Sequence, residues 1–317
     1  NAELEFADEF ERFWQFFGNY IIPLDKYKHT AKIFGGFTRT KPTYEDDVRI
    51  PPDMDVNGKS WQVGGRYNIC LPCTNRLQHS LIFGYDFRRT NNFSLFAGSL
   101  QYNNFIDVSH FLLRYEGSYE TLRGFNMFGL SVYLSPGNMT AYNKDRFFEQ
   151  ERPGTKSNYS YQILNFDRLT YLPHNFSCNF SGILQLSSGK LLPSNELALG
   201  GHISVRGYRE NEVIGDRGVL LKGELRSSPI KLINRKKINN GLQILGFIDF
   251  GYTNNADQNL LTKDSAILIS TGPGIRYNLN SYLNIKCDYG IQLKTVNGTF
   301  LGNGRHNRFH LAVTAGY

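Results

Sequence analysis

The chain has 317 residues, of which 40% are hydrophobic, 14% aromatic and 20% charged, and its formal net charge is +7. No stretch approaches the roughly 18 consecutive apolar residues that a membrane-spanning helix needs, so the sequence excludes a membrane crossing by helices. Lysine and arginine are scattered along the chain, which argues against a nucleic-acid partner. The abundance of Phe and Tyr, 24 and 19 residues, favours β-strands.

The start of the chain and its cysteines set further limits. The sequence begins with Asn1 and shows neither an initiator methionine nor a signal peptide, so we expect a mature protein or an excised fragment. Cys70 and Cys73 form a single Cys-Leu-Pro-Cys motif, which can be a redox pair, half of a zinc site or a local disulfide. The sequence leaves these alternatives open. Cys178 and Cys287 fall on the apolar faces of expected strands, where we expect small hydrophobic side chains.

Several segments alternate between apolar and polar residues with the period of a β-strand, and no segment between them has a helical period. The alternation is found in residues 61–71, 77–88, 283–293 and 308–317. The polar face carries Gly, Asn, Gln, Ser and opposite charges, whereas that of a soluble sandwich is rich in Lys, Glu and Thr. Strands of about ten residues with these two faces are typical of membrane barrels. The sequence therefore predicts an all-β fold, a transmembrane antiparallel β-barrel over residues 1–317.

Short and long connections alternate between the expected strands. Tight turns are predicted at 23–27, 72–75 and 172–175, and long connections at 40–59, 135–158, 199–225, 254–265 and 295–307. This alternation is typical of outer-membrane barrels. Residues 227–241 are long where a short turn is expected, and residues 120–125 are not assigned. About eight strands precede residue 199 and five follow it, an odd total from which we expect strands to be missing at the N-terminus.

The stretch LGGHISVRGYRENEVIGDRGVLLKGEL, residues 199–225, has no strand period in its first half. Its glycines permit the tight or left-handed turns that fold a loop back on itself. An arginine of this loop inside the barrel lumen would need a carboxylate, because a guanidinium removed from water is costly unless it is paired. Segment 242–253 offers Asp249, because its apolar residues occupy the opposite face. We therefore expect Arg206 to pair with Asp249 in the lumen.

These motifs together resemble the C-terminal barrel of the two-partner secretion translocators. These are the hemolysin secretion/activation proteins of the ShlB/FhaC/HecB type, within a superfamily that includes the assembly factor BamA. The Val-Arg-Gly-Tyr/Phe motif of the family's lumen loop is matched by Val205, Arg206, Gly207 and Tyr208. The acidic strand motif Phe-x-Asp-x-Gly is matched by Phe247, Asp249 and Gly251. The flanking Leu-Gly-Gly and Gly-Asp-x-Gly favour the secretion branch and contribute Gly200, Gly201, Gly215, Asp216 and Gly218.

The resemblance implies a sixteen-stranded barrel of which about thirteen strands are present here, without the first strands and the periplasmic POTRA domains. It implies a translocator in the outer membrane of a Gram-negative bacterium that secretes and activates a large exoprotein of the hemolysin or adhesin type. The alternative is an assembly factor of the BamA type. Further implied partners are outer-membrane lipid, lipopolysaccharide and the barrel assembly machinery. The implied C-terminal insertion signal comprises Phe309, Leu311, Val313 and Tyr317, with Tyr317 in place of the commoner Phe.

No residue pattern points to catalysis. The seven histidines lack metal-ligand spacing, and neither a Ser/His/Asp constellation nor a phosphate loop is found, so we expect no enzyme activity, no cofactor and no metal. Lys222 and Glu224, on the inward face of the strand after the loop, are interpreted as a lumen charge ladder. The pair of Arg206 and Asp249 could also be an architectural clamp with no part in transport.

Overall fold

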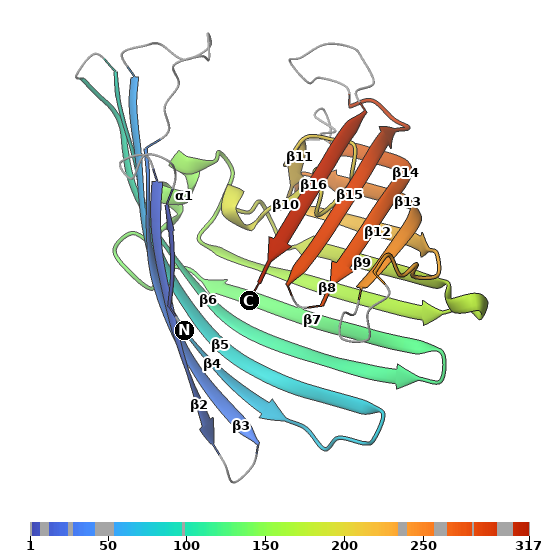
Figure 1. The fold of residues 1–317 in the computed structure, drawn as a ribbon. Coiled ribbons are helices and arrows are strands. Elements are labelled where there is room, and N and C mark those ends of the chain that lie inside the picture. The colour runs from blue at the N-terminus through green and yellow to red at the C-terminus, as the bar shows by residue number, and fades with distance from the viewer. Residues whose placement is uncertain are drawn as a thin grey trace.

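The computed structural model describes residues 2–6, 13–24, 28–41, 54–96, 99–233, 240–256, 265–280, 282–296 and 307–316. Fourteen strands form one sheet, in which each strand pairs antiparallel with the next in the order β1 to β9 and then β12 to β16. Figure 1 shows that this sheet bends into a tall curved wall, whose concave side faces a lumen. A separate ribbon of two short strands, β10 and β11, lies in the loop between β9 and β12.

The strands of the wall differ widely in length. The first nine are β1 (Ala2–Phe6), β2 (Phe13–Leu24), β3 (His29–Thr40), β4 (Met54–Cys70), β5 (Leu77–Phe96), β6 (Ser99–Thr121), β7 (Gly124–Pro136), β8 (Asn158–Tyr171) and β9 (Ser177–Ser187). The last five are β12 (Arg217–Arg226), β13 (Asn240–Asn254), β14 (Ser265–Leu279), β15 (Leu283–Gln292) and β16 (Arg308–Ala315). The five strands expected after the loop are confirmed, whereas nine precede it instead of eight. The total among the described residues is therefore even, so the argument from an odd count was wrong.

Connections at the short-turn end of the wall follow the sequence closely. Tight turns join β4 to β5 and β8 to β9, the latter through the 3-10 helix Pro173–Asn175. Most of the turn predicted at 23–27 lies outside the described residues. The unassigned residues 120–125 form another tight turn, because β6 ends at Thr121 and β7 begins at Gly124. In the longer segment 227–241, an isolated bridge pairs Ile230 with Leu242.

The opposite end of the wall departs from the prediction in two ways. Strands β5 and β6 have 20 and 23 residues, and the part of β6 before Phe111 extends beyond the ladder with β7. The connection from β7 to β8 contains the helix α1 (Asp145–Glu151), although no helix was expected. Phe148 of α1 is buried against Ile106 and Val108 of the extended strand, which explains why a helix of only seven residues is stable there.

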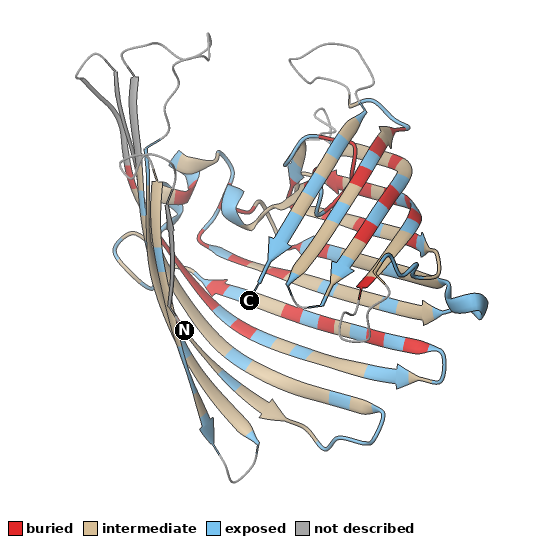
Figure 2. Ribbon diagram, in the orientation of Figure 1, coloured by how far each residue is buried: buried red, intermediate tan, exposed pale blue. Residues whose placement is uncertain are grey.

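Side chains alternate across the wall as the period of two requires. On β13, Ile244 and Ile248 on the outer face are 54% and 58% exposed, whereas Phe247 and Asp249 on the inner face are buried. The orientation predicted for residues 242–253 is therefore confirmed. Buried residues gather in β12 to β15, along β7 and in the parts of β6, β8 and β9 near the long loops, whereas β2 and β3 have none (Figure 2). The core thus lies between the wall and the loops folded against its inner face.

Two further observations concern the whole wall. Among the described residues, no helix is long and apolar enough to cross a membrane. No ladder in the described ranges joins β1 to β16, so each of these strands has one free edge. If β16 is counted as the sixteenth strand of the family barrel, the loop between β9 and β12 connects the eleventh strand to the twelfth, as the resemblance implies.

Candidate functional site

The loop between β9 and β12 enters the lumen through a narrow neck. Strands β10 (Leu197–Leu199) and β11 (Val213–Gly215) pair antiparallel and hold the two sides of the neck together. Beyond β10, Gly200 and Gly201 have φ angles of +110° and +100°, which only glycine adopts readily. A Cβ at Gly200 would lie 2.3 Å from the carbonyl oxygen of Arg209. These two glycines therefore turn residues 200–212, which we call the loop tip, back toward the wall.

Apolar residues anchor the loop tip to the inner face. Val205 and Tyr208 are buried in a cluster with residues of the neck and the wall, namely Leu199, Leu220 and Leu268. The Tyr208 hydroxyl accepts a hydrogen bond from the backbone N–H of Ile269 at 3.1 Å and donates one to the carbonyl of Lys294. Tyr208 therefore fixes the tip against β14 and the end of β15 with both its ring and its hydroxyl.

Arg206 lies at the centre of the site and is fully engaged. Its Nε and Nη2 atoms donate to the two carboxylate oxygens of Asp249, each at 2.7 Å. Its Nη1 atom donates to Glu224 at 2.6 Å and lies 3.5 Å from Asp288. The guanidinium carbon lies 3.6 Å from the ring centroid of Phe247, which forms a cation–π contact. Arg206 and Asp249 are 1% and 0% exposed, so this bidentate pair is shielded from water.

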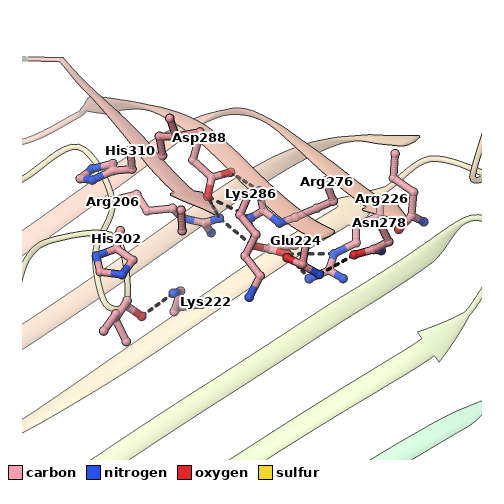
Figure 3. Close-up of a pocket in the computed structure, with 15 residues that line it drawn as sticks. His202, Arg206, Lys222, Glu224, Arg226, Arg276, Asn278, Lys286, Asp288 and His310 are labelled. Carbon is pink, nitrogen blue, oxygen red and sulfur yellow. Dashed lines mark hydrogen bonds and ion pairs between the residues drawn. The ribbon is translucent and has the colours of Figure 1, made fainter. Parts of the chain in front are cut away.

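The acidic partners of Arg206 belong to a wider ion network (Figure 3). Arg276 of β14 donates to both carboxylate oxygens of Asp288, at 2.7 and 2.9 Å, and lies 3.2 Å from Glu224. Arg226 donates to the second oxygen of Glu224 at 2.6 Å. Cations and carboxylates therefore alternate across β12 to β15, and each buried charge has an opposite charge beside it. This compensation allows so many charged groups to lie inside the wall.

The backbone of Gly207 adds two hydrogen bonds to the wall. Its N–H donates to Nε2 of His310 on β16 at 3.0 Å, and its carbonyl accepts from the side chain of Gln292 at 2.7 Å. Gly207 has a φ of +90°, and Gly290 of β15 lies directly against it. The loop tip therefore contacts every strand from β12 to β16.

The structure brings together most of the residues that the sequence singled out. Val205, Arg206, Gly207 and Tyr208 meet the strand motif of Phe247, Asp249 and Gly251, as expected. Gly251 admits Val205, because a Cβ there would lie 2.8 Å from a Val205 methyl group.

Several contributors to the site were missed or misread, among them Arg276, Arg226 and His310. Glu224 is a direct partner of Arg206, which corrects its interpretation as a member of a charge ladder. Asp288 and Gln292 were placed on the polar face of their strand, but nothing in the sequence indicated that they meet the loop.

The motif residues after the loop tip lie in a different place. Asp216 is buried at the base of the loop, where it receives Nη1 of Arg152 at 2.5 Å and the backbone N–H groups of Leu191 and Ala256, each at 2.7 Å. Arg152 also lies 3.1 Å from Glu196. Burial raises the pKa of Glu196, while the charge of Arg152 opposes this shift. This base cluster ties together the β7–β8, β9–β12 and β13–β14 loops.

Gly215 and Gly218 flank Asp216 where the chain passes close to β13. A Cβ at Gly215 would lie 2.0 Å from the Thr253 hydroxyl, and one at Gly218 would lie 2.3 Å from the carbonyl oxygen of Tyr252. These two glycines therefore allow the base of the loop to pack against the wall, and they do not touch the loop tip.

We expect Arg152→Ala to lower the free energy of unfolding by about 1.5–3 kcal/mol, because Asp216 keeps its backbone donors but loses its charged partner. The measurement is urea unfolding of the folded protein in detergent. Arg123→Ala is the matched control, since Arg123 is exposed in the turn between β6 and β7 and should change stability little. Equal effects of the two substitutions would contradict a stabilising base cluster.

The remaining sequence predictions fall on the edges of the wall. Phe309, Leu311 and Val313 of β16 point outward and are more than half exposed, whereas Tyr317 lies outside the described residues. Cys70 and Cys73 are both free thiols, with their sulfur atoms 3.9 Å apart. Within the described part of the chain, no group of three or more His, Cys, Asp or Glu side chains could hold a metal ion.

The curved antiparallel wall and the arginine loop clamped to its inner face define a barrel-like all-β fold with a loop held on the concave side. The family model of the haemolysin secretion/activation protein ShlB/FhaC/HecB matches residues 20–277. The chain belongs to this family. No curated protein matches the sequence.

Solved structures share the fold at low sequence identity. CdiB from Escherichia coli is similar with a TM-score of 0.75 and 14% identity, over 95% of this chain and 52% of that one. CdiB from Acinetobacter baumannii has a TM-score of 0.67 and 14% identity, over 95% and 50%. BamA from Haemophilus ducreyi, lacking POTRA domains 1–3, has a TM-score of 0.61 and 14% identity, over 96% and 62%. The chain thus spans about half the length of the two CdiB structures.

Proposed function

We propose that this chain is the barrel of an outer-membrane translocator that secretes and activates a large partner exoprotein in two-partner secretion. The observation that carries the proposal is the loop tip, which is held inside the lumen by Arg206 through ion pairs and hydrogen bonds. Membership of the secretion family supports it. A polypeptide crossing the lumen needs the space that the loop tip fills, so transport requires the tip to leave its seat.

The contacts of the loop suit such a displacement. No ladder of backbone hydrogen bonds joins residues 200–212 to the wall among the described strands, so the tip is held by side-chain contacts that form and break independently of the sheet. The base of the loop is held separately, by Asp216 and Arg152. The tip can therefore move while the base stays fixed, and the energy needed is that of exchanging buried polar and apolar contacts for contacts with water or with the exported chain.

A reversible tether tests this function. A Val205→Cys and Gly251→Cys pair places two thiols where Val205 now contacts the inner face of β13. We expect oxidation to block secretion of the cognate exoprotein by the full-length protein in cells, and reduction to restore it. Cys70 and Cys73 are replaced by serine in the background, and each single cysteine variant serves as a control. Unchanged secretion with the tether closed would contradict the proposal.

The same experiment distinguishes the proposed translocator from an assembly factor of the BamA type. The structural likeness to BamA is the reason to test this alternative. Closing the tether in an assembly factor would deplete other β-barrels from the outer membrane. A translocator instead loses only its exoprotein. Depletion of unrelated barrels together with normal secretion would favour assembly over secretion.

We also propose that the outer face of the wall contacts membrane lipid. Ile248→Arg should cost roughly 2–4 kcal/mol if this exposed position of β13 lies near the bilayer midplane. Gln78→Arg, at an exposed position that lines the inner side near β4, should cost little by comparison. Urea unfolding of the full-length protein in lipid vesicles measures both. Equal costs on the two faces would contradict a membrane-embedded wall.

The outward side chains of the last strand, β16, also bear on how the barrel is assembled in the membrane. The exposed aromatic and aliphatic side chains of Phe309, Leu311 and Val313 alternate outward along β16, which suits recognition of the last strand by the barrel assembly machinery. Lipid and lipopolysaccharide of the outer membrane of a Gram-negative bacterium would then cover the outer face.

A further inference from the structure

Beside the loop tip, the inner face lines an open cavity of about 420 Å³. Five cationic side chains line it, but only two carboxylates do. The cations are Arg206, Lys222, Arg226, Arg276 and Lys286, and the carboxylates are Glu224 and Asp288. Because Arg226, Asn278 and Asn284 at its rim lie at the ends of strands next to the short turns, the cavity lies toward the end of the wall that carries those turns.

The two carboxylates are already occupied by arginines. Glu224 accepts from Arg206 and Arg226 and lies beside Arg276, while both oxygens of Asp288 accept from Arg276. Each carboxylate thus has a guanidinium at hydrogen-bond distance on every oxygen. The arginines therefore occupy both carboxylates that line the cavity, and neither carboxylate is left to pair with a lysine.

Lys222 and Lys286 are the cations that this network does not neutralise. The ammonium group of Lys222 donates to the neutral carbonyl of Ile203 in the loop tip at 2.6 Å. Lys286 forms no ion pair with any described residue and lies directly opposite Arg276 in the ladder between β14 and β15. Like charges placed directly opposite destabilise a sheet, so this arrangement favours an anion nearby. Figure 3 shows the amines of both lysines directed into the cavity.

Other acidic groups near these lysines reduce the excess of positive charge but do not cancel it. Asp249 lies opposite Lys222 in the ladder, but both of its oxygens bind Arg206. Asp167 faces the lumen from β8, two strands away from Lys222, and forms no ion pair with it. The cavity therefore keeps an excess of positive charge on the path between the short-turn end and the loop tip.

We infer that Lys222 and Lys286 form a carboxylate-binding site for acidic segments of the exported polypeptide. This inference rests on the proposed secretion function, and it assigns the translocator a preference for acidic substrate segments. A peptide is favoured over a lipid phosphate because the cavity lies on the inner face of the wall, whereas lipid would meet the exposed apolar residues of the outer face. A carboxylate that binds Lys222 also competes with the Ile203 carbonyl, so an arriving acidic segment would loosen one contact of the loop tip.

The test is a binding assay with the full-length protein in detergent. Fluorescence anisotropy measures binding of a labelled twenty-residue peptide that contains a block of six glutamates. The control probe is the same peptide with six glutamines in place of the glutamates. Lys222→Gln together with Lys286→Gln should weaken binding of the glutamate peptide about tenfold or more and reduce its dependence on salt. Lys144→Gln together with Lys156→Gln, both in the exposed loop around α1, removes the same charge and should leave binding unchanged.

Charge reversal sharpens the result. Lys222→Glu together with Lys286→Glu should abolish binding of the glutamate peptide and create binding of a six-lysine peptide. Equal affinity of the two lysine-to-glutamine double variants, or equal binding of the glutamate and glutamine peptides, would overturn the inference. The inference would also be overturned if labelled lipopolysaccharide bound and inorganic phosphate displaced it while the glutamate peptide did not bind, because the site would then take a lipid phosphate.

The binding assay does not depend on secretion, so the two proposals fail separately. If the cognate exoprotein is secreted normally and the glutamate peptide does not bind, the carboxylate site is wrong and the translocator stands. If the peptide binds and no exoprotein is exported by the unaltered protein, the site stands and the secretion function is wrong.

Discussion

Arg206→Ala is expected to lower the free energy of unfolding by roughly 3–5 kcal/mol and to stop secretion by the full-length protein. The substitution leaves the buried carboxylate of Asp249 without its bidentate partner and removes one cation from Glu224. Asp249→Ala should cost less, because Arg206 keeps the carboxylate of Glu224 at 2.6 Å. The double variant should be no worse than Arg206→Ala alone, since the contact between the two residues is already lost.

Two further substitutions separate this pair from a general effect of charge. Arg206→Lys should recover little, because one ammonium group cannot bind Asp249 with two parallel hydrogen bonds and reach Glu224 as well. Arg209→Ala removes an exposed arginine of the same loop tip and should leave stability nearly unchanged. Urea unfolding in detergent and secretion in cells give the two readouts. Additive losses in the Arg206 and Asp249 double variant would show that the two residues act independently.

The sequence predicted the wall because its signal is local. A strand reveals itself by an alternation of period two, and the same alternation assigned Asp249 to the inner face of β13. The partnership of Arg206 with Asp249 also followed, because a buried guanidinium requires a carboxylate. The strand assignments need only the order of residues within one segment, and the pair needs only the charges of two such segments.

The rest of the site depends on distances between segments, which the sequence does not contain. Glu224, Asp288 and Arg276 come from β12, β15 and β14, and they meet only because the registers of three ladders bring them to one level of the wall. Helix α1 was missed for a related reason, since its seven residues are stabilised by the packing of Phe148 and not by a helical period.

Asp216 shows how proximity in sequence can mislead. It lies only ten residues from Arg206, and both belong to motifs of one loop, yet the ribbon of β10 and β11 separates the two. Arg206 binds carboxylates in the lumen, whereas Asp216 binds Arg152 at the base. The loop therefore has two polar anchors with different partners, and a substitution at one should leave the contacts of the other in place.

Close packing of two backbones should make Gly290 highly sensitive to a single added methyl group. A Cβ at Gly290 would lie 2.2 Å from the backbone nitrogen of Gly207 and 2.5 Å from its Cα. Both are backbone atoms, so no side-chain rotation relieves the overlap, and the loop tip must move away. The hydrogen bonds from Gly207 to His310 and from Gln292 to Gly207 would then be lost together.

We therefore expect Gly290→Ala to release the loop tip while the strands of the wall stay paired. Overpacking of this kind costs about 1–3 kcal/mol, and the loss of the polar contacts of the tip adds to it. Trypsin provides the measurement, because Arg206 is protected in its buried seat and becomes a cleavage site once the tip leaves it. Gly246→Ala is the control, since a Cβ at this position of β13 meets nothing within 4 Å. Cleavage at Arg206 should rise about tenfold or more in Gly290→Ala and stay unchanged in Gly246→Ala. Equal protection of Arg206 in both variants would mean that the tip does not depend on the contact between Gly207 and Gly290.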